Sequence, residues 1–452
     1  MVRKLLYQSL CVCFAFTTLG LTSFPSSLQM DVTASPLKED QPNGPLLQLD
    51  PLRVSPFTLS HTFNESEIAF DDGPFDPRGS VVFTKKSGLL KLWNTRTGEL
   101  MRTLDTHQEP SNVSFNSDGS SIIAIGKDKK TKRITTELWS ADSNALKATF
   151  DGVIIFGPGR IGSDPTVVLT IHKNEVEFWN GDTGRLIKVV EAYQNRLLND
   201  EYSPDGRLVV RGGKKPVLWE TDSGKLRAEL ELPRDAPKSS DYTGRSLEIE
   251  KEKFSPDGQT VVTVDSFNRI ELWDPITGKL RAILVGHRDS IYEIEFSNDG
   301  RLLATASRDG TARVWDVSTG QLKHTFKAGK QIARRVTFSP SDTVLAVGYQ
   351  NQARLWNVNT GQLIGELSED KDISSTTLLG TYLHGIELRF RPDGNLLLTE
   401  SDKTVKVWDA KTGKFIATLE NARPPMALSS NGKYLATAGP DKSVLLWEIS
   451  AR

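Results

Sequence analysis

Residues 286–326 hold the clearest copy of a pattern that recurs along the chain, and they read GHRDSIYEIEFSNDGRLLATASRDGTARVWDVSTGQLKHTF. Four short β-prone runs, at 291–296, 302–307, 311–316 and 321–326, are separated by turn residues such as Asp299-Gly300. This pattern predicts four antiparallel strands joined by tight turns. One such sheet cannot bury both of its faces alone, so neighbouring copies must pack against each other.

Tryptophan marks the end of the third run in each copy. The chain has nine tryptophans at spacings of 39 to 54 residues, namely Trp93, Trp139, Trp179, Trp219, Trp273, Trp315, Trp356, Trp408 and Trp447. A period of about 40 to 45 residues is typical of propeller repeats. Radial stacking of four-stranded sheets would give an all-β protein, a single β-propeller.

From residue 57 onward the chain resembles the WD40-repeat family. The Trp-Asp pair of that family is present at Asp274, Asp316 and Asp409, and its Ser-Pro-Asp-Gly turn recurs at 203–206 and 255–258. The resemblance implies a propeller domain over 57–452 that serves as a platform for other proteins. A propeller hosts many functions, so the fold alone names no partner.

The two ends of this domain are expected to meet in one sheet. The chain stops five residues after Trp447, before a fourth strand, and residues 59–63 (LSHTF) resemble 322–326 (LKHTF). We therefore predict that 57–63 supplies the outer strand of the last blade and removes an open sheet edge. This gives a ring of nine blades. A ring of eight, with an aberrant third unit around 156–159, is the alternative.

The N-terminal region differs from the repeats in composition. Arg3 and Lys4 precede an uncharged run at 5–21 that contains Cys11 and Cys13, which is the layout of a secretory signal peptide. We assign 1–28 to the signal and 29–56 to a proline-rich linker. The interpretation is an exported member of bacterial type, periplasmic or extracellular, and the alternative is anchoring to a membrane by an uncleaved signal.

Composition argues against several classes of site. Lys plus Arg is 56 and Asp plus Glu is 57, so the net charge of -1 lacks the basic excess of a general nucleic-acid binder. The six histidines show no ligand spacing, and both cysteines lie in the predicted signal, so no metal site is expected. We also expect no cofactor, no catalytic residue and no stable membrane span in the mature chain, and we expect a monomer.

Four residues of the clearest repeat form a possible constellation, namely His287, Ser307, Asp309 and Trp315. In the WD40 family, residues of these types form a structural hydrogen-bond network within one blade. The physical reason is that a buried indole N–H and a buried imidazole both need partners. We therefore interpret the four residues as structural.

A basic run occupies 127–133, between the second and third strands of the second unit. Its candidate partner-binding residues are Lys129, Lys130, Lys132 and Arg133. Two further insertions, at 232–250 and 368–385, join outer to inner strands and should emerge on the same face of the propeller. Insertions tend to gather on the binding face of repeat proteins. The alternative is a hairpin tip that is merely solvated.

The sequence thus favours a non-enzymatic scaffold that binds a protein or peptide through this loop-rich face. The alternative is an enzyme or ligand sensor that uses the central channel. That alternative would need polar residues of the inner strands to converge, with Glu201, Lys253, Glu295, Arg335 and Arg389 as candidates.

Overall fold

A computed structural model describes the chain over most of the repeat region. The described residues are 56–64, 73–116, 118–151, 153–154, 167–172, 175–180, 185–191, 201–212, 216–220, 225–230, 249–327, 331–349, 352–368, 386–400 and 404–450. Contacts divide the chain into two units, Met1–Leu52 and Arg53–Arg452, and all described residues belong to the second unit. The predicted signal and all of the predicted linker except Pro56 lie outside the described residues.

The described strands form nine antiparallel sheets, eight of four strands and one of three. We number the sheets 1 to 9 in chain order. Sheets 1 to 4 comprise β2 (Val81–Lys86), β3 (Leu89–Asn94) and β4 (Leu100–Asp105); β5 (Gln108–Phe115), β6 (Ser121–Asp128), β7 (Ile134–Ser140) and β8 (Leu146–Asp151); β9 (Val153–Ile154), β10 (Val167–His172), β11 (Glu175–Asn180) and β12 (Arg185–Glu191); β13 (Glu201–Tyr202), β14 (Leu208–Arg211), β15 (Val217–Glu220) and β16 (Leu226–Glu229).

The remaining five sheets follow the same order along the chain. Sheets 5 to 9 comprise β17 (Ile249–Phe254), β18 (Val261–Asp265), β19 (Ile270–Trp273) and β20 (Leu280–Leu284); β21 (Ile291–Phe296), β22 (Leu302–Ser307), β23 (Thr311–Asp316) and β24 (Leu322–Lys327); β25 (Arg335–Phe338), β26 (Val344–Gly348), β27 (Gln352–Asn357) and β28 (Leu363–Ser368); β29 (Glu387–Phe390), β30 (Leu396–Glu400), β31 (Val405–Asp409) and β32 (Phe415–Leu419); β33 (Arg423–Leu428), β34 (Tyr434–Ala438), β35 (Val444–Ile449) and β1 (Phe57–Phe63).

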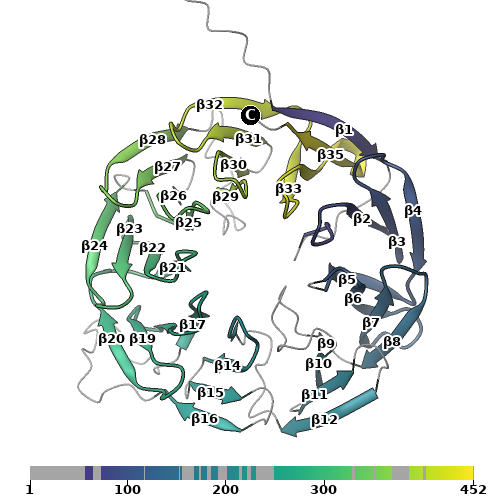
Figure 1. Ribbon diagram of the computed structural model, residues 1–452, viewed down its shortest axis with the longest axis horizontal. Helices are drawn as coiled ribbons and strands as arrows, with labels where there is room; N and C mark the ends of the chain where they lie inside the picture. The colour runs from purple at the N-terminus through teal and green to yellow at the C-terminus, as the bar shows by residue number, and fades with distance from the viewer. Residues whose placement is uncertain are drawn as a thin grey trace, which may run out of the picture. The chain divides into compact units, whose positions relative to one another are not determined.

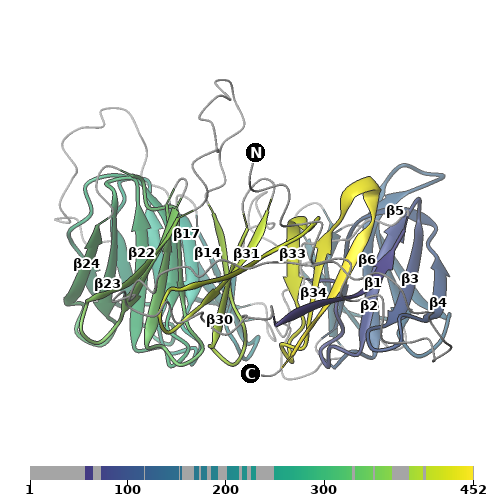
Figure 2. The same cartoon turned by 90° about the horizontal axis from the view of Figure 1, so that it is seen from above.

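Within the second unit the sheets stand around a ring, with the first strand of a sheet nearest the centre and the last strand outside (Figure 1). Seen from above, the sheets stand side by side and their connections lie at two opposite edges (Figure 2). This arrangement is the β-propeller that the repeat pattern predicts. Connections between second and third strands share one edge with the outer-to-inner connections, and the other turns occupy the opposite edge.

The core of the unit lies between sheets rather than inside any one of them. Middle strands such as β18 and β26 are buried along their whole length. One hydrophobic cluster joins sheets 5 and 6, with Val262, Leu272, Phe296 and Trp315 among its members. Because both faces of a middle strand pack on neighbouring sheets, these strands are almost continuously apolar, whereas strands with a single buried face alternate.

The N-terminal strand pairs with the last strand, as predicted. β1 runs antiparallel to β35, from Phe57 opposite Ile449 to Phe63 opposite Val444. Phe63 is buried and stacks on Trp93 of sheet 1, with 4.6 Å between ring centroids. Sheet 9 is therefore built from both ends of the domain and packs against sheet 1.

Eight of the nine neighbouring pairs of sheets share a hydrophobic cluster among the described residues. The remaining junction, between sheets 3 and 4, falls largely on residues outside the described ranges, as does the aberrant turn expected at 156–159. The described residues form nine sheets, and a single closed ring of nine blades stays a prediction.

Helical structure in the described part of the chain is limited to one short 3-10 turn, Pro440–Lys442. The described residues hold no helix of sufficient length and apolar character to cross a bilayer.

Candidate functional site

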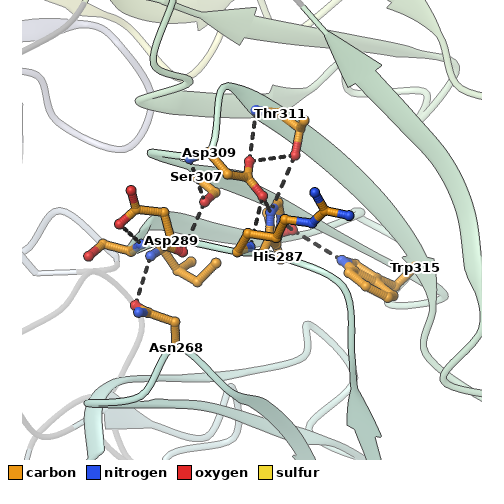
Figure 3. Close-up of polar contacts among 11 residues, drawn as sticks. Asn268, His287, Asp289, Ser307, Asp309, Thr311 and Trp315 are labelled. Atoms are coloured by element: carbon orange, nitrogen blue, oxygen red, sulfur yellow. Dashed lines mark hydrogen bonds and ion pairs between the residues drawn. The ribbon is translucent and has the colours of Figure 1, made fainter. Parts of the chain in front are cut away.

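The four-residue constellation of sheet 6 is a buried chain of hydrogen bonds (Figure 3). His287 Nδ1 lies 2.9 Å from Asp309 Oδ2, and its Nε2 lies 2.7 Å from Thr305 Oγ1. The same hydroxyl accepts a bond from Trp315 Nε1 at 3.1 Å. The imidazole is 1 % exposed, so its partners lie inside the sheet. The structure thus links His287, Asp309 and Trp315 through a threonine.

Ser307 is not the hydroxyl that joins Trp315 to His287, which corrects the grouping drawn from the sequence. Its Oγ donates to the Asp289 carbonyl at 3.0 Å and accepts from the Asp309 amide at 3.1 Å. Leu303 lies opposite Trp315 in the ladder, and Thr305 lies two residues further along β22. Side chains alternate with a period of two, so Thr305 shares the face of Leu303 and comes within reach of the indole.

The protonation states of His287 and Asp309 follow from their burial and from the charges beside them. Burial lowers the pKa of His287, although the bond to Asp309 opposes this, so the ring is neutral. Burial opposes ionisation of Asp309, but bonds from His287 and Thr311 outweigh it and lower the pKa of this carboxyl. Nδ1–H therefore donates to the carboxylate, and Nε2 is left to accept the Thr305 hydroxyl proton.

Among the described side chains, the indole–threonine bond is seen in five sheets. Trp93, Trp273, Trp315, Trp408 and Trp447 donate to the hydroxyls of Thr84, Thr263, Thr305, Thr399 and Thr437, at 2.8 to 3.1 Å. Each threonine precedes its tryptophan by nine or ten residues. This spacing is visible in the sequence and would have identified Thr305.

Sheet 2 satisfies its tryptophan with a glutamate. Ala124 occupies the position equivalent to Thr305 and supplies no hydroxyl. Glu137 Oε2 accepts from Trp139 Nε1 at 3.0 Å, and its Oε1 lies 3.1 Å from His107 Nδ1. One buried carboxylate therefore accepts from both the indole and the imidazole in sheet 2, a task that Thr305 and Asp309 share in sheet 6.

Sheet 5 holds a third arrangement. Trp273 donates to Thr263, and the Thr263 hydroxyl donates to Glu271 Oε2 at 2.9 Å. Burial, together with the nearby charge of Asp265, raises the pKa of Glu271 to about 8. Arg269 pairs with Asp265 at 2.6 Å and lies 3.8 Å from Glu271 Oε1. At neutral pH this glutamate is mainly a neutral hydrogen-bonding group.

Arg335, one of the residues proposed for the centre of the ring, is paired with two glutamates that were not among the candidates. Arg335 Nε donates to Glu387 Oε1 at 2.9 Å, and its Nη1 lies 3.6 Å from Glu293 Oε1. Burial alone would lower the pKa of Arg335, but the charges of Glu387 and Glu293 raise it. Glu293, Arg335 and Glu387 thus come from sheets 6, 7 and 8 and form one row in which a base lies between two acids.

Glutamates of this region also hold neighbouring sheets together. Glu293 Oε2 accepts from the Val336 amide at 2.8 Å, and Glu295 Oε1 accepts from Phe338 N at 3.2 Å. Burial raises the pKa of Glu293 to about 7, and it also raises the pKa of Glu295 despite the charge of Lys253. These carboxylates satisfy amides on the free edge of β25, a structural role that accounts for their position.

The other two candidates lie on different strands. Arg389, on β29, is exposed and carries a charge that lowers the pKa of Glu400, which burial raises to about 7 overall. Glu201 is half-buried on β13. The described residues contain no group of His, Cys, Asp and Glu arranged to hold a metal ion. Four of the five candidates therefore lie in sheets 5 to 8, near charges of opposite sign.

The basic run of sheet 2 is the tip of a lengthened hairpin. β6 and β7 have eight and seven residues, against six each for β22 and β23. Lys127 and Asp128 thus belong to a strand, and the turn itself covers 129–133. Asp128 organises the turn, because its Oδ1 accepts from the amides of Lys130 and Thr131 and its carbonyl accepts from Lys132 N at 3.0 Å.

The four basic candidates differ in their surroundings. Lys129 Nζ donates to the Thr106 carbonyl at 2.8 Å and lies 3.6 Å from Asp105 Oδ1, so this lysine braces the connection between sheets 1 and 2. Lys130, Lys132 and Arg133 are exposed. Among the described residues, no carboxylate forms an ion pair with these three. Lys129 is therefore structural, and the other three can meet a partner.

The hairpin tip and an outer-to-inner connection share one face, as the topology predicted, because Lys129 touches residues 105–107. The insertions expected at 232–250 and 368–385 fall outside the described residues, apart from their ends at 249–250 and 368. Their grouping with the hairpin tip therefore stays a prediction.

Comparisons with known proteins agree with this architecture. The family model for the WD domain, G-beta repeat, matches residues 278–316, 377–409 and 413–448. The chain is 29% identical over 160 residues to the WD repeat-containing protein VIP3 of Arabidopsis thaliana, covering 34% of this chain and 50% of that protein. It is 27% identical over 264 residues to the nuclear distribution protein nudF of Aspergillus niger, covering 53% and 57%.

A third relative is the serine-threonine kinase receptor-associated protein of Gallus gallus, 24% identical over 219 residues, with 42% of this chain and 61% of that protein covered. The chain spans about half the length of the curated relatives it matches. The matched segments, together with the recurring tryptophan-bearing sheets, show that this chain contains repeats similar to those of WD40-repeat proteins.

Proposed function

We propose that this protein is a non-enzymatic scaffold that binds another protein through the face carrying the 127–133 hairpin. WD40 repeats and WD-repeat relatives support a protein-interaction role. One of those relatives is named for its association with a kinase receptor, and we extend only the idea of protein binding to this chain.

The observation that carries the proposal is the ordered, exposed tip of the hairpin in sheet 2. Its turn is held by Asp128, so the backbone that carries Lys130, Lys132 and Arg133 has little conformational freedom to lose on binding. The polar residues near the centre of the ring, by contrast, bind one another and the β25 amides. This self-pairing favours the scaffold over an enzyme or ligand sensor that uses the centre.

Site-specific photo-crosslinking in the native host tests the proposal. A photoreactive residue at Lys132 should give protein adducts, and the same residue at Lys411, in a turn on the opposite face, should not. Adducts from position 411 alone, or from positions beside Arg335 alone, would contradict the assigned face.

We further propose that the protein is exported, in the manner of a bacterial secreted or periplasmic protein, with 1–28 as its signal segment, 29–56 as a linker and 57–452 as the propeller. The support is the uncharged run at 5–21 behind Arg3 and Lys4. N-terminal sequencing of the protein from its host should find a new end before residue 57. An intact Met1 on soluble protein inside the cell would argue against export.

A further inference from the structure

We propose that the hairpin tips of sheets 1 and 2 form one composite surface that binds a carboxylate-rich protein segment. This inference deepens the proposed function and rests on it, because it assigns a chemistry to the partner. We call the surface the paired tips and define it as residues 85–88, 105–109, 127–133 and Ile134.

The paired tips are one connected structure rather than two independent loops. The Gly88 carbonyl accepts from Thr106 N at 2.9 Å, and the His107 carbonyl accepts from Lys129 N at 3.0 Å. Gly88 has a φ of 86°, and a Cβ placed there would lie 2.6 Å from Lys129 Nζ. The tip of sheet 1 therefore abuts the tip of sheet 2, with the connection at 105–107 between them.

The surface is basic although the chain is not. Segments 85–88, 105–109 and 127–133 contain seven lysines and arginines and three acidic residues, in a protein whose net charge is -1. Two of the three acids are engaged locally, since Asp105 lies beside Lys129 and Asp128 accepts the turn amides. The unbalanced positive charge of Lys130, Lys132 and Arg133 thus faces outward, where it attracts a segment of opposite sign.

The geometry favours carboxylates over a phosphate group. A phosphate at a turn is usually held by converging backbone amides or by bidentate arginines. Here the amides of Lys130 and Thr131 already donate to Asp128, and the paired tips hold six lysines and a single arginine. Lysines act as separate point charges, which suits acidic side chains spread along a peptide.

An apolar side chain beside the charges favours a protein segment over a nucleic acid. Ile134 begins β7 next to Arg133 and is 47 % exposed. Such a residue gains free energy when an apolar side chain of a peptide covers it, whereas a nucleic-acid backbone offers only phosphate and sugar. The partner chemistry is therefore acidic residues interspersed with apolar ones.

The test measures binding of the full mature chain to a fluorescent peptide of alternating glutamate and leucine, with a glutamine-for-glutamate peptide as the reference. The patch variant carries Lys130→Ser, Lys132→Asn and Arg133→Ser. Asn is chosen at 132 because this residue has a φ of 60°, which asparagine tolerates. The matched control removes three charges from turns on the opposite face, by Lys411→Ser, Lys414→Ser and Lys433→Ser.

We expect the acidic peptide to bind, the patch variant to bind about tenfold more weakly at low salt, and the control variant to match the parent. Raising salt from about 50 mM to about 500 mM should shrink the difference, because the charges are exposed. Equal losses in both variants, or equal binding of the glutamine peptide, would overturn the inference.

Two further probes separate other partners. A single-stranded oligonucleotide or a phosphatidylserine vesicle that binds as tightly as the peptide, and depends on the same three cations, would overturn the choice of a protein segment. If the peptide fails to bind while crosslinking at position 132 still captures a protein, the acidic-partner inference alone is wrong. If crosslinks arise only from position 411, the proposed face itself is wrong.

Discussion

A buried indole N–H is stabilised by an acceptor, and sheets 2, 5 and 6 provide one in different ways. Sheet 6 uses Thr305 backed by His287, sheet 5 uses Thr263 backed by Glu271, and sheet 2 uses Glu137 directly. What these sheets share is the position of the tryptophan and the requirement for a partner. The identity of the partner varies because any acceptor within reach of the indole satisfies it.

A double-mutant cycle tests whether Thr305 is the partner of Trp315. Thr305→Val should destabilise the fold by about 1–3 kcal/mol, because the indole and His287 Nε2 both lose their partner. Combined with Trp315→Phe, it should show a coupling energy of about 1 kcal/mol, since the two changes remove the same bond. Ser307→Ala with Trp315→Phe should be nearly additive. Chemical denaturation measures all of these values, and coupling with Ser307 instead would contradict the assignment.

The buried carboxyl of Glu271 should make stability depend on pH. Its pKa is raised from 4.5 to about 8 in the folded protein, so the folded state binds an additional proton between these values. The stabilisation is therefore complete below about pH 4.5 and is lost as the pH rises toward 8. Glu271→Gln, which keeps an acceptor for Thr263, should flatten the fall of melting temperature between pH 5 and 8. An unchanged pH profile in the variant would show that Glu271 does not titrate in this range.

Strand β1 illustrates how an element far from the C-terminus completes the last sheet. Its two phenylalanines are buried, and Ser450 N donates to the Pro56 carbonyl at 2.9 Å, so the pairing extends to the last described residue. Without β1, the edge of β35 and the faces of Leu446 and Trp93 would meet water.

Two truncations separate the contribution of β1 from that of the preceding residues. Deletion of 1–50 should leave the melting temperature unchanged, because it removes no described contact. Deletion of 1–63 should cost at least about 3 kcal/mol, from two phenylalanine side chains that no longer bury their surface. Calorimetry on both proteins measures the difference, and equal melting temperatures would refute the role assigned to β1.

At the scale of the whole molecule, stability comes from packing between neighbouring sheets. The clusters that join sheets 8 and 9, and sheets 9 and 1, contain Phe57 and Phe63 of β1. Pro56 and Ser450 are hydrogen-bonded neighbours. We therefore expect the stability of the domain to depend on the contacts between sheets, and not on where the chain enters and leaves sheet 9.

A circular permutant tests this arrangement. Joining the C-terminus after Ser450 to Pro56 by a short flexible linker, with new ends between Ser318 and Thr319, should preserve the circular dichroism spectrum. The melting temperature should stay within about 5 °C, because the new ends lie in an exposed turn and β23 and β24 can still pair. The unlinked fragments serve as the control. A permutant that aggregates under conditions where the parent folds would contradict the adjacency of the two ends.

The sequence alone determined the repeat, the nature of its strands and the pairing of 57–63 with the last sheet. Two local patterns can be read directly from the sequence. They are the tryptophan at every 39 to 54 residues and the similarity of LSHTF to LKHTF. The sequence also predicted that the buried indole of Trp315 would need a hydrogen-bond partner. Within a single repeat the particular hydroxyl was not predictable, because both Thr305 and Ser307 lie on β22 and the cross-strand register decides which one reaches the indole of Trp315. Only the nine- or ten-residue spacing shared by several repeats points to Thr305.

Only the tertiary structure decided how charges from different repeats meet. Lys129 was one cation of a basic run in the sequence, yet it braces Thr106 across two sheets, while Lys130, Lys132 and Arg133 stay exposed. Glu293, Arg335 and Glu387 lie 42 and 52 residues apart in successive repeats and form one row. Such contacts depend on how neighbouring sheets stack, and the free energy of a charge depends on its surroundings, which no single repeat contains.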